Sequence, residues 1–124
     1  MQVSRGRPGK MDSKELKERT KRFAVHIIKS VDGLKQTSAT SVLSKQITRS
    51  ATSIGENYRA ACGARSKAEF IAKLQIVRVE SDETLFWLEL FQEALGLDNI
   101  KDLIKECDEL TAVFTASLKT ARVK

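Results

Sequence analysis

The sequence contains few of the residues from which disulfide frameworks and metal centres are built. It has two cysteines, Cys62 and Cys107, which are far apart and lack a CxxC partner, and it has a single histidine, His26. This pattern argues against a secreted disulfide scaffold and against a thiolate zinc site. We therefore expect free thiols in a cytoplasmic protein, with packing or surface roles for all three side chains.

Long apolar runs are also missing. The longest lies around residues 85–91 and is interrupted by Glu89, whereas a membrane-spanning helix needs roughly 20 apolar residues. The first ten residues are basic and have no apolar segment, unlike a signal peptide. We expect no contact with a membrane, a flexible basic tail over residues 1–11, and one domain over residues 12–124.

Motifs of catalysis are absent as well. The chain has no glycine-rich phosphate loop, no HExxH pair and no recognisable Ser/His/Asp arrangement. We therefore predict a protein that is not an enzyme, with no catalytic residue, no metal site and no cofactor. Enzymatic activity is a third hypothesis, after the two given at the end of this subsection. A metal or cofactor that stays bound through purification would support it.

Helical periodicity dominates what is present. Apolar residues recur at helical spacing, and the 124 residues include one proline and six glycines. The pattern predicts four helices, over residues 12–33, 41–61, 66–95 and 98–121. Asp12 with Glu15 and Ser66 with Glu69 form capping boxes at two starts, and Gly96 ends the third helix. Short connections make neighbouring helices antiparallel, so we predict an all-α, up-down-up-down four-helix bundle.

The third predicted helix has two apolar stripes, where a bundle helix normally has one. The first, which suits a bundle core, contains Phe70, Leu74, Val77, Ser81, Leu85, Leu88, Gln92 and Leu95. The second, about 140° around the helix, contains Ala72, Ile76, Val79, Phe86, Trp87, Leu90 and Ala94. The second stripe either widens the core or meets another subunit. We favour a subunit interface at Phe86, Trp87 and Leu90; the alternative is that Phe86 and Trp87 cover one end of the bundle.

Two acidic residues, Glu80 and Glu83, interrupt this apolar territory. Buried carboxylates need cationic or hydrogen-bonding partners, and the candidates on the second helix are Arg49, Asn57, Tyr58 and Arg59. Paired carboxylates also occur in acid/base and di-metal sites, but a di-metal bundle needs a histidine on each of two helices. We expect structural pairing. Asn57 either fixes register on the helix seam or is exposed at a helix end.

Charge is unevenly distributed along the chain. Residues 1–75 carry 16 basic and 6 acidic side chains, whereas residues 76–124 carry 6 and 10. The candidates for contacts to nucleic-acid phosphates are Lys14, Lys21, Arg22, Lys29, Lys45, Arg65 and Lys67. The same asymmetry is also compatible with attraction between oppositely charged halves of different subunits, and with ordinary solvated helix faces.

Three motifs carry a resemblance to a known family. They are Gln46-Ile47-x-Arg49-Ser50-Ala51-x-Ser53-Ile54-x-x-Asn57, then Ala64-Arg65-Ser66-x-x-Glu69-Phe70-Ile71, and then Glu80-x-x-Glu83-Thr84-x-x-Trp87-Leu88. Over residues 16–120 the chain resembles the small bacterial four-helix bundle proteins encoded within 23S ribosomal RNA intervening sequences.

The resemblance implies a ring-like homopentamer. It also implies kinship with the accessory proteins of diversity-generating retroelements, which bind nucleic acid and a reverse transcriptase. At the matched positions it implies a polar network of Arg49, Asn57, Glu80 and Glu83, with Trp87 as a packing or interface anchor. Most members of the family have no established biochemical activity.

Two functions follow as the main hypotheses. The first is an oligomeric, non-enzymatic accessory protein that binds RNA or DNA mainly through phosphates, since the basic segments lack interleaved aromatics for base stacking. The second is a scaffold that docks a foreign protein through the stripe of Phe86, Trp87 and Leu90.

Overall fold

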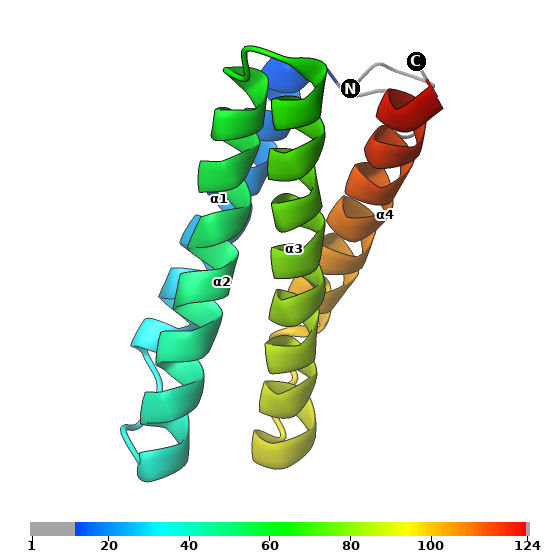
Figure 1. Cartoon of the computed structure of the whole chain (residues 1–124). Coiled ribbons are helices and arrows are strands. Elements are labelled where there is room, and N and C mark those ends of the chain that lie inside the picture. The colour runs from blue at the N-terminus through cyan, green and yellow to red at the C-terminus, as the bar shows by residue number, and fades with distance from the viewer. Residues whose placement is uncertain (1–11, 124) are drawn as a thin grey trace.

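The computed structural model describes residues 12–123, so the tail predicted over residues 1–11 lies outside the described residues. Four helices run alternately up and down (Figure 1), namely α1 (Ser13–Asp32), α2 (Ser38–Cys62), α3 (Lys67–Leu95) and α4 (Lys101–Val123). No strand occurs between residues 12 and 123. The predicted all-α four-helix bundle is confirmed.

Capping groups set the helix starts. The Asp12 carboxylate accepts a hydrogen bond from the main-chain N–H of Glu15 at 2.8 Å, and the Glu15 carboxylate accepts one from the N–H of Asp12. At α3, Ser66 Oγ accepts from the N–H of Glu69 at 3.0 Å, but the Glu69 carboxylate accepts from the N–H of Arg65 instead of that of Ser66. The predicted capping box is therefore complete at α1 and half-formed at α3.

The α2 helix begins earlier than predicted. Thr37 Oγ1 accepts from the N–H of Thr40 at 3.1 Å, and Thr40 Oγ1 accepts from the N–H of Thr37 at 2.8 Å. These bonds form a capping box in which threonine replaces the usual Glu or Gln. The predicted polar link at residues 36–40 thus already contains the first turn of α2. In contrast, α4 begins at Lys101, three residues after the predicted cap Asp98.

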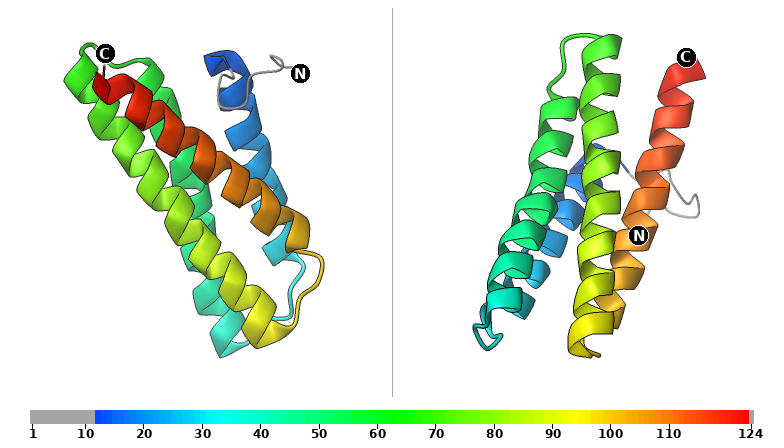
Figure 2. Two further views of the ribbon diagram at one scale, coloured as in Figure 1. Left: turned by 90° about the vertical axis from the view of Figure 1, so that its right-hand side faces the viewer. Right: turned by 60° about the horizontal axis from the view of Figure 1, so that its bottom comes forward.

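The four helices pack unequally. Helices α2 and α3 share the largest contact, and α1 and α4 share the smallest. Figure 2 shows that α1 and α4 diverge toward the end of the bundle at which α1 begins and α4 finishes. The core is continuous through all four helices; its largest fully buried side chains include Phe23, Ile54, Leu74, Phe91 and Phe114.

The buried arc of α3 differs from the predicted core stripe. Thr84 and Phe91, which the periodicity left out of that stripe, are buried, whereas Gln92 is half-buried. The arc is displaced toward α2 because α2 is the more extensive contact of α3. Thr84 Oγ1 donates to Ser50 Oγ of α2 at 2.8 Å, so this small polar pair lies inside the helix contact without a lost hydrogen bond.

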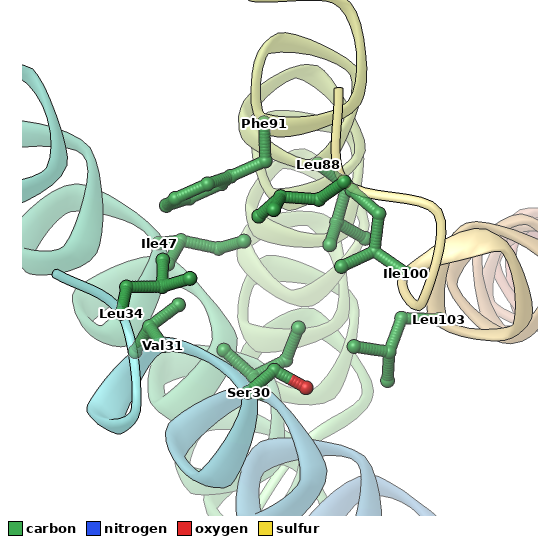
Figure 3. Close-up of a pocket in the computed structure, with 10 residues that line it drawn as sticks. Ser30, Val31, Leu34, Ile47, Leu88, Phe91, Ile100 and Leu103 are labelled. Carbon is green, nitrogen blue, oxygen red and sulfur yellow. The ribbon is translucent and has the colours of Figure 1, made fainter. Parts of the chain in front are cut away.

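The lower end of the bundle is closed by apolar side chains. Val31, Leu34, Ile47, Leu88 and Ile100 converge there (Figure 3). The void that they enclose measures only about 10 Å³, which is at the lower limit for a single water molecule. This void is therefore too small for an organic ligand.

Two adjacent isoleucines of α1 test this packing. Ile27 is 1% exposed and Ile28 is 42% exposed. Ile27→Ala should lower the free energy of unfolding by about 2–5 kcal/mol, because it removes packed methyl groups and leaves a cavity. Ile28→Ala is the matched control and should cost about 0.5 kcal/mol or less. Urea denaturation measures both; equal losses would contradict the placement of α1.

Candidate interaction surfaces

An arginine joins α2 to α3 at the surface. Arg49 Nη1 lies 3.4 Å from the Glu80 carboxylate, and Arg49 Nη2 donates to Glu83. The Glu80 side chain is only 17% exposed, whereas that of Arg49 is 53% exposed. The structure therefore brings together three of the four residues that were expected to form a polar network, and both acids gain a cationic partner.

Asn57 does not bond to this network. Its side-chain amide donates to the main-chain oxygen of Ser53 at 3.0 Å and to Ser53 Oγ at 2.9 Å, both within α2. Nor is it at a helix end, because α2 continues to Cys62. The structure does not bring Asn57 into the expected network. Its spacing of four residues from Ser53 lets the amide bond one turn back along its own helix instead.

A second arginine, which the sequence analysis did not nominate, joins α1 to α4. Arg19 Nε lies 2.6 Å from Glu106, and Arg19 Nη2 lies 2.8 Å from Glu109. The hydrogen bond to Glu106 is the largest of the causes that raise the pKa of the Arg19 guanidinium. Glu106 and Glu109 lie three residues apart on one helix face, and this spacing is the signal that could have identified them as a shared site for a cation.

The two arginines connect halves of opposite charge. Helices α1 and α2 together carry nine basic and four acidic side chains, whereas α3 and α4 carry seven and ten. Arg19 and Arg49 belong to the basic pair of helices, and all four of their partners belong to the acidic pair. The attraction between oppositely charged halves thus operates within one chain.

The seven candidate phosphate contacts are all exposed, but they do not form one cluster. Lys14, Lys21 and Arg22 on the first half of α1 lie at the same end of the bundle as the α2–α3 connection (Figure 1). Arg65 and Lys67 flank that connection, and Arg65 lies 4.0 Å from Glu69. The remaining two, Lys29 and Lys45, lie toward the other end.

A groove of about 570 Å³ runs along the outer surface between α1 and α2. Its lining residues are Lys17, Thr20, Lys21, Ala24, Thr52, Gly55, Glu56 and Arg59. Of its three cations the sequence analysis nominated only Lys21. Lys17 could have been predicted from its spacing from Lys21, since residues four apart share one side of a helix. Arg59 could not, because its position in the groove depends on how α2 packs against α1.

The second apolar stripe of α3 divides in the structure. Phe86 and Val79 are each 52% exposed and Ile76 is 40% exposed. Trp87 is half-buried at the margin of the core, and its indole lies edge-on to the Phe86 ring with 5.1 Å between the ring centroids. Trp87 therefore differs from Phe86, with which the sequence analysis grouped it. Within residues 12–123, buried Trp87 Nε1 has no hydrogen-bond partner.

The side chains with chemical reactivity have packing or surface positions. Cys107 is buried, its Sγ donates to the main-chain oxygen of Ser81 at 3.2 Å, and burial raises the pKa of its thiol to about 12. At neutral pH it is therefore a protonated thiol rather than a nucleophile. His26 is exposed beside Arg19 and Arg22 in a smaller groove between α1 and α4. Residues 12–123 contain no group of three or more side chains suited to a metal ion, and none of their helices is long and apolar enough to span a bilayer.

The two arginine contacts should differ in strength. Arg19 is 19% exposed and bonds Glu106 through two nitrogens, whereas Arg49 is 53% exposed. In a double-mutant cycle with alanine, we expect a coupling of about 1.5–3 kcal/mol for Arg19 with Glu106. For Arg49 with Glu80 we expect about 0.2–1 kcal/mol, because water screens the exposed pair. Equal couplings would contradict this ranking.

Comparisons with known proteins agree with one another. A family model described as 23S rRNA-intervening sequence protein matches residues 13–116. The chain is also similar to a crystal structure from Bacteroides thetaiotaomicron, described as a protein with unknown function from the S23 ribosomal protein family, with 34% identity and a TM-score of 0.80. That match covers 88% of this chain and 99% of the other. No curated protein matches. Because the family model spans most of the chain, the chain belongs to the 23S rRNA-intervening sequence protein family.

Proposed function

We propose that this chain is a non-enzymatic accessory protein that assembles with copies of itself and binds RNA or DNA through phosphates. The observation that carries the proposal is the unneutralised charge of α1 and α2. Among the residues that the structure describes, none of the exposed Lys14, Lys21, Arg22, Lys29 and Lys45 forms an ion pair with an acidic side chain. Free cations on one side of a protein attract a polyanion.

The chemistry of the same helices favours binding without base recognition. The aromatic residues of α1 and α2 are Phe23 and Tyr58, and both are buried. The exposed ring on these helices is the imidazole of His26 in the α1–α4 groove, so stacking on an exposed phenyl or phenol ring is not available on the basic side. Lysine and arginine contacts to phosphate position a nucleic acid but do not discriminate its sequence. The proposed binding is strong at low salt and weakly dependent on sequence.

Self-association is supported by an exposed apolar face on α2 and α3. Arg49 pairs with Glu83 across these antiparallel helices. Val42, seven residues before Arg49, lies on the Arg49 side of α2, and Phe86, three residues after Glu83, lies on the Glu83 side of α3. Val42 is 59% exposed and Phe86 is 52% exposed. Exposed apolar side chains that gather on one face are typical of protein interfaces. The resemblance to the family adds the expectation of five copies in a ring, which would repeat the basic surface.

The family also suggests the cellular context. Its description links members to intervening sequences of 23S rRNA, which makes RNA a reasonable ligand to test first. The kinship with retroelement accessory proteins, part of the same proposal, would add a reverse transcriptase as a protein partner. The neighbouring genes discriminate between these two contexts. The intervening-sequence context predicts a gene within a ribosomal RNA operon, whereas the retroelement context predicts a gene beside that of a reverse transcriptase.

A second candidate function uses the same apolar face. The exposure of Phe86 beside half-buried Leu90 and Trp87 also suits a scaffold that docks a foreign protein. The oligomeric state separates the two candidates. A stable homo-oligomer assigns the face to self-assembly, whereas a monomer in which Trp87 is quenched by soluble quenchers assigns it to another protein.

Salt dependence tests nucleic-acid binding. In fluorescence anisotropy with a labelled RNA or DNA strand, we expect tight binding at about 50 mM salt. The affinity for a single strand should fall by about 300-fold between 50 and 200 mM if about six cations of the assembly contact phosphates, at about 0.7 in the log–log slope per contact. A scrambled strand of the same length is the control and should bind equally. Undetectable binding of RNA and of DNA at the lower salt would refute the proposal.

Light scattering on the purified chain tests self-association. The wild-type protein should have the mass of a homo-oligomer. Val79→Glu places a charge on the exposed apolar face and should shift the mass toward the monomer, because burial of an unpaired carboxylate is costly. Val25→Glu, at a residue of α1 that is 39% exposed, should leave the mass unchanged. A wild-type monomer would rule out the assembly.

A further inference from the structure

We propose that the groove between α1 and α2 is the track for the phosphate backbone of a single nucleic-acid strand, held by Lys17, Lys21 and Arg59. The inference rests on the proposed nucleic-acid binding and assigns it to one place on the molecule. Two of these three residues, Lys17 and Arg59, were not among the phosphate contacts predicted from the sequence. The groove would hold successive phosphates between a wall formed by α1 and a wall formed by α2.

The charges of the groove are unbalanced. Lys17 and Lys21 are one turn apart on α1, where like charges repel, and Arg59 lies on the α2 wall. Among the lining residues that the structure describes, Glu56 is the one acid, and neither it nor any of the three cations forms an ion pair within residues 12–123. The groove thus has a net positive charge, which phosphate oxygens would neutralise.

The hydroxyl groups of the groove are already engaged. Thr20 Oγ1 donates to the main-chain oxygen of Lys17 at 3.1 Å, and Thr52 Oγ1 donates to the main-chain oxygen of Thr48 at 2.8 Å. Their hydrogens are therefore turned to their own helices. Recognition of an oxyanion in this groove consequently depends on the ammonium and guanidinium groups.

The floor of the groove depends on a glycine. A Cβ on Gly55 would lie 3.3 Å from Thr20 Oγ1, so the absence of a side chain at this position allows α1 and α2 to approach closely. This approach places the cations of the two helices on either side of one narrow surface. The short side chain of Ala24 leaves the space between them open.

The lining residues favour a strand over a small ligand. Sites for small molecules are concave and bury most of the ligand surface among apolar and aromatic groups. This groove has no aromatic lining residue and lies between two helices on the outer surface, with a volume of about 570 Å³. Such a surface suits an extended backbone whose bases point away from the protein.

The test compares two variants of equal net charge. The groove variant combines Lys17→Gln, Lys21→Gln and Arg59→Gln; the control variant combines Lys101→Gln, Lys105→Gln and Lys119→Gln, three exposed positions of α4 outside the groove lining. Anisotropy is measured with a labelled oligo-dT strand over a range of salt concentrations. We expect the groove variant to bind at least about tenfold more weakly. Its log–log salt slope should shrink by about 2, since each contact to a single strand contributes about 0.7.

The control variant should lose less than about threefold in affinity, and an abasic strand should bind wild-type protein within about twofold of oligo-dT, because no base contact is proposed. Melting followed by circular dichroism checks that the variants are folded. If the triple variant melts at a lower temperature than the wild type, a double variant replaces it, with Lys21→Gln and Arg59→Gln at two exposed positions. The log–log salt slope of the double variant should shrink by about 1.4.

Four results would overturn the inference. Equal losses in the groove and control variants would show that net charge alone matters, and tight binding of pyrophosphate or a nucleoside triphosphate without strand binding would assign the groove to a small anion. A groove variant that binds like the wild type refutes the groove but leaves the proposed function intact. A wild-type protein that binds no strand refutes both.

Discussion

The pairing of oppositely charged helices is the constraint on which the rest of the surface depends. The helix pair α1–α2, with nine basic and four acidic side chains, meets the pair α3–α4, with seven and ten, at two seams, and one arginine crosses each seam to two carboxylates. Four acids are thereby matched by Arg19 and Arg49. The other cations of α1 and α2 form no ion pair within residues 12–123, which is why the proposed nucleic-acid surface lies on that side.

The sides of α2 separate the two proposed activities. One side packs along α3 and carries Arg49 near the exposed apolar residues, whereas another contributes Gly55 and Arg59 to the groove with α1. Because α1 and α3 flank α2 on different sides, a second copy bound over the apolar face would leave the groove open. Assembly and phosphate binding are therefore compatible on the same chain.

Local sequence signals predicted most of the fold. Helical periodicity and the Asp12 cap are properties of short segments, so they can be predicted without knowledge of the tertiary structure. The burial of Phe91 was missed because it depends on how α3 is rotated against α2. The same limit applies to Arg19 and Glu106, which are 87 residues apart and meet only through the packing of α1 on α4. Arg59 joins the groove through the packing of α2 on α1.

Cross-linking most directly tests the claim that nucleic acid binds the basic helix pair. Photo-cross-linking of the full chain to an RNA strand that carries aryl azides on phosphorothioate groups of its backbone, followed by peptide mass spectrometry, locates the contact without a mutation. The account predicts cross-linked peptides from residues 13–32 and 38–62, concentrated around Lys17, Lys21 and Arg59. Cross-links confined to residues 67–123 would contradict it.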